Sequence, residues 1–224
     1  LVVRAWGYNY LMENYQDAYM NGGNTKLGIP LYDYYSPVQE SKPRATADEA
    51  YVFIKNDLNT AEQLLNDAGK GYTADISDFD LGVVNYLQVR VALATGDWST
   101  VIQKSNTLLA KYPNLISESA YGATLDTVNG EVEIRPEKNA FLNTAINPEL
   151  IFGFQAGEAS TLHNAWYNPF GQSYGGLNEG FARIDERLYN QISTNDVRKS
   201  AFMNQPWGDY TYASNGVVRN IPDL

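Results

Sequence analysis

The sequence contains no cysteine and a single histidine, His163. The absence of Cys excludes thiol nucleophiles, disulfides and thiolate ligands for zinc or iron–sulfur clusters. One imidazole cannot form a His cluster that holds a transition metal. No apolar run approaches the ~20 residues that a membrane-spanning helix needs. Basic residues are also few, 16 against 26 acidic ones, so the formal charge is −10. This charge argues against a nucleic-acid backbone as the main partner.

The residues that are abundant indicate a globular protein that binds rather than catalyses. Of 224 residues, 44% are hydrophobic and 19% charged, which is typical of a folded chain with a sizeable core. Aromatic residues make up 13%, and 17 of them are Tyr, whose apolar ring and polar tip suit wet binding surfaces. The chain begins inside a helical pattern at Leu1 and stops at Leu224 without a closing element. We therefore interpret it as a fragment of a longer protein.

Two helices are predicted in the first 66 residues. A helical pattern runs from residue 2 to about 19, broken by Gly22-Gly23-Asn24, and an extended Tyr-rich loop with three prolines follows up to Arg44. We expect one face of this helix to hold Val3, Trp6, Tyr10 and Met12 or Asn14. The second helix begins with a capping box, Thr46 to Glu49. Its apolar stripe recurs every three or four residues until about Asn66: Ala50, Ile54, Leu58, Ala61 and Leu65.

A second helical hairpin is predicted from 81 to 112. The helix over 81–95 is apolar nearly all round, through Val83, Val84, Leu87, Val91, Ala92 and Leu93, so it must be buried among other helices. Gly96-Asp97 turns the chain into a fourth helix that ends at Tyr112-Pro113. We expect its inward residues to be Val101, Ile102, Ser105, Leu108 and Leu109. Helix, Gly-Asp turn, aromatic and helix is typical of a tetratricopeptide (TPR) repeat.

Residues 114–224 lack the helical periodicity of the first part, and little helix is predicted there. Asn129-Gly130 is typical of a type I′ hairpin turn, and Asn215-Gly216 predicts a second hairpin. Residues 150–154 read as a short buried strand, and 185–192 as a short helix. We therefore predict a mainly α fold with two parts: TPR-like antiparallel helical hairpins over 1–113, then an irregular lobe with short β-hairpins over 114–224.

Three groups of residues invite a catalytic or metal-binding interpretation, and each has a plainer one. Asp75, Asp78 and Asp80 lack the ligand spacing of an EF-hand and are better interpreted as acids at a helix start. A glycosidase pair among Glu131, Glu133 and Glu137 needs a separation that a sequence cannot show. His163 with Ser160 or Ser173 lacks the Gly-x-Ser-x-Gly elbow of a hydrolase.

The aromatic residues of the long Gly- and Asn-rich loop at 156–180 are the candidate binding site. Helical periodicity does not explain them, and aromatic walls with a few polar groups are the usual form of a ligand site. A local hydrophobic core under the loop is the equally weighted alternative. The predicted ligand-binding residues are Trp166, Tyr167, Tyr174, Trp207, Tyr210 and Tyr212, with Asn164, Asn168 and Gln172 as hydrogen-bonding candidates.

Six segments, in order over residues 2 to 202, resemble one family. They are "RAWGYNYLMENYQDAY" (4–19), "GIPL" (28–31), "PRATADEAYVFIKNDLNTAEQLL" (43–65), "LGVVNYLQVRVALATGDWSTVIQ" (81–103), "NPELIFGFQ" (147–155) and "NDVRKSAF" (195–202), in which Val197 replaces a family Pro. Together they resemble the SusD/RagB family of outer-membrane nutrient-binding lipoproteins. The family has no universal motif of binding residues, but its ligand loops follow the Asn-Pro-Glu segment.

The resemblance implies a SusD-like fold, no enzymatic activity and no cofactor or metal. It implies capture of an oligo- or polysaccharide at the cell outer membrane, on a surface-exposed lipoprotein, and delivery to a SusC-like TonB-dependent transporter. A lipid anchor absent from this stretch of sequence would make the only membrane contact, and nucleic acid is not an expected partner. The main alternative is a TPR-type scaffold that binds a protein or peptide segment. A carboxylate glycosidase is a third possibility.

Overall fold

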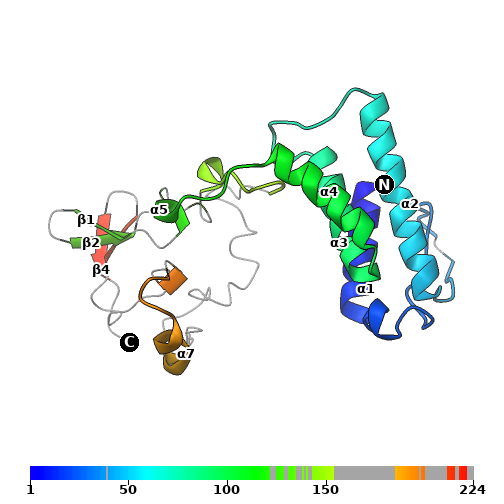
Figure 1. Cartoon of the computed structure of the whole chain (residues 1–224), viewed down its shortest axis with the longest axis horizontal. Coiled ribbons are helices and arrows are strands. Elements are labelled where there is room, and N and C mark those ends of the chain that lie inside the picture. Colours follow the sequence, from blue (N-terminus) through cyan, green and yellow to red (C-terminus); the bar gives the residue numbers. More distant parts are fainter. Residues whose placement is uncertain are drawn as a thin grey trace. The chain divides into compact units, whose positions relative to one another are not determined.

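The computed structural model divides the chain into two compact units, Leu1–Pro113 and Asn114–Leu224 (Figure 1). It describes residues 1–38, 40–121, 125–128, 131–134, 138, 140, 143–153, 185–196, 198–199, 211–214 and 217–220, and only the backbone of the strands among them. The boundary follows Pro113, where the sequence predicts the end of the helical part. Each unit is described by itself.

The first unit consists of two helical hairpins. Helix α1 (Val2–Tyr15) packs on α2 (Ala47–Asp67), α2 packs on α3 (Leu81–Thr95), and α3 packs on α4 (Trp98–Lys111). Figure 1 shows the four helices side by side, with a long connection from α2 to α3. The short 3₁₀ turn η1 (Tyr19–Asn21) follows α1. The mainly helical fold is therefore as predicted.

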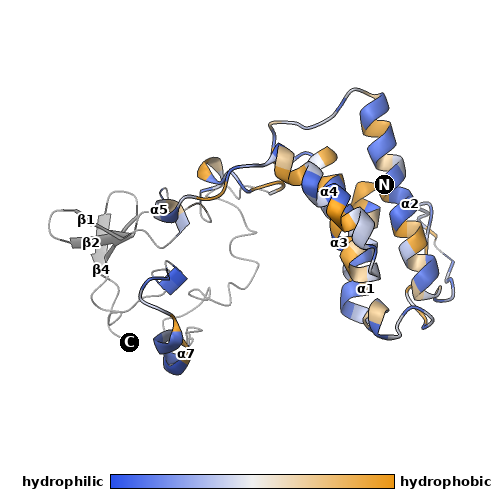
Figure 2. Cartoon of the chain, viewed as in Figure 1, coloured by the Kyte–Doolittle hydropathy of each residue, from blue (hydrophilic) through white to orange (hydrophobic). Residues whose placement is uncertain are grey.

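Helix α2 forms as its sequence predicts. The Thr46 hydroxyl accepts the Glu49 backbone N–H at 3.2 Å, and a Glu49 carboxylate oxygen accepts the Thr46 N–H at 2.8 Å, which completes the capping box. The stripe Ala50, Ile54, Leu58 and Ala61 is buried. Hydrophobic and hydrophilic colours consequently alternate along α2 in Figure 2, because only one face meets the other helices.

Helix α3 is the centre of the unit, and its predicted bounds, 81–95, are confirmed. Val83, Val84, Leu87, Val91 and Ala92 are buried, but Leu93 is exposed, so the prediction that the helix is apolar and covered all round is wrong at that position. The helix ends at Gly96, whose φ of 74° is the left-handed conformation that glycine adopts without strain. That conformation lets the Asp97 N–H reach back to the Ala92 carbonyl at 2.9 Å.

Helix α1 differs from its prediction in length and in face. It ends at Tyr15, not near Tyr19, because Gln16 is extended and its side chain donates to the Gly23 carbonyl at 3.2 Å as the chain turns back. The buried residues are Ala5, Asn9 and Met12, whereas Val3, Trp6 and Tyr10 are exposed. The predicted face is thus wrong except at Met12.

Helix α4 buries less than predicted. Val101, Ser105 and Leu108 are half-buried, but Ile102 and Leu109 are 63% and 64% exposed, so the prediction that both point inward is wrong. The reason is that α4 packs mainly on α3 alone, which covers a narrower stripe than two neighbours would.

The second unit contains short elements. Helices α5 (Glu118–Tyr121) and α7 (Glu186–Gln191) and the 3₁₀ turn η3 (Thr144–Ile146) are described with strands β1 (Leu125–Val128), β2 (Glu131–Ile134), β3 (Thr211–Ser214) and β4 (Val217–Asn220). The sheet order is β1-β2-β3-β4; the outer pairs are antiparallel and the central pair is parallel. The strands flank Asn129-Gly130 and Asn215-Gly216. These turn residues lie outside the described ones, so the turn types stay predictions.

The predicted strand at 150–154 is wrong over its described residues. Residues 150–153 bend instead of extending, and the Leu150 side chain lies against Gly153, where a Cβ would meet it at 3.4 Å. Just before the bend, the Asn147 side chain accepts the Glu149 N–H at 3.0 Å, and the Glu149 carboxylate accepts the Ile116 N–H at 2.7 Å. The Asn-Pro-Glu segment therefore forms a turn that fixes the chain entering α5.

Candidate functional site

The predicted ligand-binding residues cannot be placed as a site. Tyr212 lies on β3, where only the backbone is described. The other eight lie outside the described residues: Trp166, Tyr167, Tyr174, Trp207, Tyr210, Asn164, Asn168 and Gln172. Their role in binding stays a prediction. The residues of the catalytic alternatives, His163, Ser160, Ser173 and Glu137, also lie outside the described residues.

The acidic group before α3 has the structural role expected of helix-start acids. The Asp80 carboxylate accepts the backbone N–H groups of Gly82 at 2.8 Å and Val83 at 3.2 Å, and so caps α3. Asp75 accepts the Ser77 N–H and hydroxyl, at 2.9 and 2.7 Å, and these two bonds lower the pKa of Asp75. Among the residues that the structure describes, no group of three or more His, Cys, Asp or Glu could hold a metal ion.

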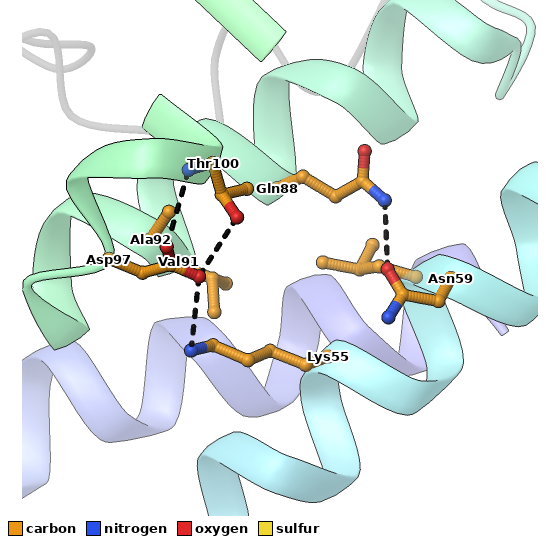
Figure 3. Close-up of a pocket in the computed structure, with 8 residues that line it drawn as sticks. Lys55, Asn59, Gln88, Val91, Ala92, Asp97 and Thr100 are labelled. Atoms are coloured by element: carbon orange, nitrogen blue, oxygen red, sulfur yellow. Dashed lines mark hydrogen bonds and ion pairs between the residues drawn. The ribbon is translucent and has the colours of Figure 1, made fainter. Parts of the chain in front are cut away.

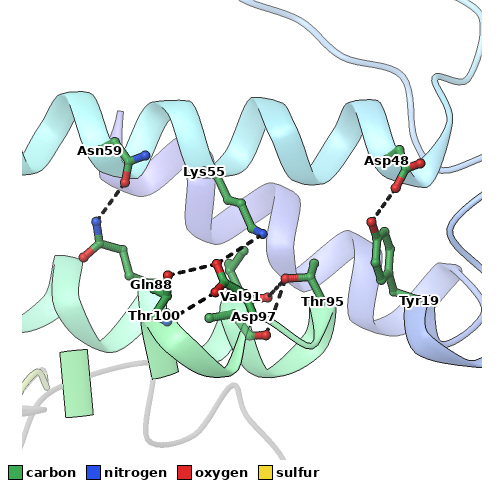
Figure 4. Close-up of polar contacts among 10 residues, drawn as sticks. Tyr19, Asp48, Lys55, Asn59, Gln88, Val91, Thr95, Asp97 and Thr100 are labelled. Carbon is green, nitrogen blue, oxygen red and sulfur yellow. Dashed lines mark hydrogen bonds and ion pairs between the residues drawn. The ribbon is translucent and has the colours of Figure 1, made fainter. Parts of the chain in front are cut away.

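A small pocket with polar and apolar lining residues lies between α2 and the α3–α4 hairpin (Figure 3). Lys55 and Asn59 line it from α2, Gln88 from α3, and Asp97 and Thr100 from the start of α4. Asp97 accepts the Thr100 hydroxyl at 2.8 Å and its backbone N–H at 3.2 Å, and these bonds lower the pKa of Asp97. Lys55 stands 3.9 Å from the same carboxylate. Figure 4 shows these contacts together with the hydrogen bond from Tyr19 to Asp48.

The pocket is too small for a sugar ring. Its volume is about 80 Å³, whereas small-molecule sites are typically about 300–1,000 Å³. Its small size and its few polar groups, beside the apolar Leu58, Val91 and Ala92, suit water molecules instead. The Gln88 amide at the pocket wall donates to Asn59 at 3.1 Å and to Glu62 at 2.8 Å, and Lys104 of α4 pairs with Glu62 at 2.5 Å. These bonds tie three helices together, so we assign the pocket to the framework of the unit.

The loop between η1 and α2 is a more open candidate site, and its base is fixed by backbone hydrogen bonds. Leu27 and Thr46 form an antiparallel bridge, and the Gly28 N–H donates to the Ala45 carbonyl at 2.6 Å. The Arg44 guanidinium donates to the carbonyls of Gly28 at 2.5 Å and Leu27 at 2.8 Å. The two ends of the loop are thus joined to each other before α2 begins.

Two side chains of α1 hold the middle of the same loop. Arg4 binds both carboxylate oxygens of Asp57 on α2 at 2.7 Å and donates its remaining Nη1 to the Asp33 carbonyl. The hydrogen bond to Asp57 raises the pKa of Arg4. The Tyr8 hydroxyl donates to the Tyr32 carbonyl at 3.1 Å and accepts the Tyr32 N–H at 2.7 Å. The loop backbone at 32–33 is therefore attached directly to α1 and, through the Arg4–Asp57 pair, indirectly to α2.

Beyond these attachments, the loop displays exposed aromatic rings. Tyr34 is 64% and Tyr35 90% exposed. Two such rings on a fixed backbone can stack on an apolar face of a ligand. The sequence shows a Tyr-rich loop here, but no motif in it predicts a role in binding. The signal that could have found it is the pair Tyr34-Tyr35 before Ser36-Pro37, where no helical or strand period accounts for the rings.

Comparison with known proteins gives a likeness among solved structures. The chain is similar to the crystal structure of a SusD-like carbohydrate binding protein from Bacteroides vulgatus, with a TM-score of 0.52 and 26% sequence identity. The likeness covers 68% of this chain and 28% of that one, so the chain spans little more than a quarter of that protein. No family model matches the chain. No curated protein matches it either. Within the described residues, none of the helices has the length and apolar character required to cross a bilayer.

Proposed function

We propose that this chain belongs to a non-catalytic protein that captures glycans at the outer-membrane surface and delivers them to a SusC-like TonB-dependent transporter. The likeness to a SusD-like carbohydrate binding protein over 68% of the chain is the observation that carries the proposal. The helical hairpins and the Tyr-rich composition agree with it, because a rigid scaffold with aromatic rings suits glycan capture. In this proposal the full-length protein is a surface-exposed lipoprotein.

The aromatic residues of the second unit remain the proposed principal site. Trp166 and Trp207 are the first to test, since an exposed Trp platform and a buried Trp respond differently to truncation. Stacking contributes about 1–3 kcal/mol by analogy with nucleic-acid bases. A buried Trp truncated to Ala costs about 3–5 kcal/mol of folding free energy. Lost glycan binding at an unchanged melting temperature supports the site; a lowered melting temperature with binding intact in the folded fraction contradicts it.

Affinity electrophoresis of the chain in native gels containing starch, xylan, mannan or dextran tests the function. We expect at least one polysaccharide to retard the chain, with no release of reducing ends. Retardation by none of a broad panel would contradict glycan capture, and release of reducing ends would favour a glycosidase.

A TPR-type scaffold that binds a protein or peptide segment is the second candidate, and one observation favours it. The outer surface of α4 carries Trp98, Ile102 and Leu109, all largely exposed, and apolar residues on one helix face are typical of protein contacts. Trp98→Ala separates the two functions. It leaves glycan retardation unchanged under the first and abolishes partner binding under the second.

A further inference from the structure

Four residues of the loop between η1 and α2 form a continuous exposed and mostly apolar edge. Tyr34, Tyr35, Pro37 and Val38 are all exposed, and Val38 is 82% so. Single exposed apolar side chains are ordinary, but a contiguous set on one short segment indicates a contact surface. Among the described residues, the hydroxyls of Tyr34 and Tyr35 make no hydrogen bond. Both rings are thus available to a ligand.

The loop is held in place before any ligand arrives. Its backbone at 32–33 is bonded to Tyr8 and Arg4, and the Tyr32 hydroxyl accepts the Lys42 N–H at 3.2 Å. The Lys42 ammonium lies 5.3 Å from the centre of the Tyr32 ring, which joins the two limbs of the loop. Because Tyr also has few rotatable bonds, ordering these rings on a ligand costs little conformational entropy.

The residues on either side of the two rings in the sequence, Asp33 and Ser36, carry polar groups. The Asp33 carboxylate is exposed, and a bond from its own backbone N–H, helped by Lys42 at 3.5 Å, lowers its pKa, so it is an ionised acceptor at neutral pH. Ser36 supplies a hydroxyl, which donates to the Val38 carbonyl at 2.9 Å and accepts the Val38 N–H at 3.3 Å, so one lone pair is left for a further hydrogen bond. A pyranose ring has apolar C–H faces and polar hydroxyl groups around its edge. The Tyr rings match the faces, and the neighbouring polar groups match the hydroxyls.

The charge of the loop selects among ligands. Residues 31–44 carry two acids, Asp33 and Glu40, and two bases, Lys42 and Arg44, so the loop is neutral within a chain of charge −10. Lys42 is paired with Asp33, and Arg44 is bonded to backbone carbonyls. This arrangement offers no excess positive charge to an acidic glycan, a phosphate or an acidic peptide.

We propose that Tyr34 and Tyr35 form a saccharide-stacking site for a neutral glycan in the helical unit, separate in sequence from the aromatic residues predicted at 164–174 and 207–212. The proposal rests on the proposed glycan-capture function. The rings supply the stacking surfaces, and Asp33 and Ser36 accept hydrogen bonds from sugar hydroxyls. A chain with two such sites engages one polysaccharide at two points, which strengthens retention on a polymer more than on a short oligosaccharide.

The test compares the wild-type chain with Tyr34→Ala/Tyr35→Ala and Tyr34→Phe/Tyr35→Phe in native gels containing starch, xylan, mannan, dextran or the acidic polysaccharide polygalacturonate. The Kd for the retarding polysaccharide is obtained from mobility against polysaccharide concentration. We expect the Ala variant to weaken binding by about fivefold or more, by analogy with loss of an aromatic platform for nucleic-acid bases. The Phe variant should keep most of the affinity, because it keeps both rings. Tyr15→Ala is the matched control, an equally exposed Tyr on α1.

The outcomes separate this site from the function on which it rests. Retardation of the wild type with an unchanged Kd in the Ala variant overturns the Tyr34–Tyr35 site and leaves glycan capture standing. No retardation of the wild type overturns glycan capture and this site with it. An equal loss in the Tyr15→Ala control, or tighter binding to polygalacturonate than to every neutral polysaccharide, also contradicts the proposal. Circular dichroism sets the folded concentration of each variant.

Discussion

At the scale of single residues, the ion pair between Arg4 and Asp57 is the most consequential contact in the helical unit. The Asp57 side chain is only 8% exposed, and both of its oxygens are bonded to Arg4 at 2.7 Å. Arg4 also lies over the Phe53 ring, 4.8 Å from its centre. The pair joins α1 to α2, and the same guanidinium holds the loop in position by donating to the Asp33 carbonyl.

Arg4→Met should therefore destabilise the chain more than an ordinary surface change. Removing one partner of a largely buried pair leaves an uncompensated carboxylate, which costs about 3–5 kcal/mol when burial is complete, and the partial exposure of Arg4 puts the expected loss near the lower end. Urea denaturation measures it. The matched control is Lys26→Met, which removes the exposed pair with Asp17 and should cost at most about 1 kcal/mol. Equal losses in both variants would show that the pair is not buried in solution.

Glu49 of the capping box gives the chain a predictable pH dependence. Hydrogen bonds from the Thr46 backbone N–H and hydroxyl lower the pKa of Glu49 below its ordinary 4.5. A carboxylate with a lowered pKa in the folded state stabilises that state above the unfolded pKa and loses the contribution as the pH falls through the folded value. The stability of the wild type relative to Glu49→Gln should therefore be constant above about pH 5.5 and decrease below pH 4.5.

Thermal unfolding of both proteins between pH 3 and 7 measures this difference. Gln is the suitable comparison because it can occupy the same position of a capping box without titrating. A difference that stays constant across the whole range would mean that Glu49 does not bond to the Thr46 N–H in solution.

At the scale of elements, the stability of the helical unit depends on which face of each helix is buried. Leu87 of α3 is buried, whereas Leu93, six residues further along the same helix, is exposed. Leu87→Ala should cost about 2–5 kcal/mol of unfolding free energy, and Leu93→Ala about 0.5 kcal/mol or less. Chemical denaturation of the two variants measures both losses of unfolding free energy. A large loss for Leu93→Ala would mean that α3 is buried on all sides, as the sequence predicts.

The sequence predicts those elements best whose signal is local. The capping box fixes where α2 begins, and Asp80 with Gly96 fixes both ends of α3, because each residue satisfies backbone groups within its own turn. The faces of α1 and α4 were predicted poorly. Trp6 and Ile102 are apolar, and periodicity alone puts them inward, but which face is covered depends on neighbours that a single helix does not reveal.

The candidate sites show the same limit. The bend at Leu150–Gly153 depends on contacts within the second unit, which hydrophobic residues in a row do not encode. From its sequence, the Tyr34–Tyr35 loop is an extended connection between two helices and nothing more specific. Its attachment by Arg4 and Tyr8 joins residues 24 to 29 positions apart, which no motif predicts.

At the scale of the whole molecule, the division after Pro113 makes the helical unit a candidate for independent folding. It has its own buried core, formed by α1, α2 and α3, and a chain of 113 residues is within the usual size of a domain. Residues 1–113 expressed alone should give a helical circular dichroism spectrum and one cooperative thermal transition. A spectrum without helix, or loss of signal with no cooperative transition, would show that the second unit is required.

In the 28–44 loop, the residues that fix the backbone differ from those that are exposed to a ligand. This difference affects how binding preference can change over generations. Arg4, Tyr8 and Arg44 determine the path of the backbone, whereas Tyr34, Tyr35 and Val38 are largely exposed. Substitutions at the displayed positions therefore leave the folding free energy nearly untouched. A lineage can exchange Tyr35 for Trp, His or Asn and sample new ligands without first acquiring a compensating mutation. The loop is thus a position where specificity is free to diverge while the scaffold stays the same.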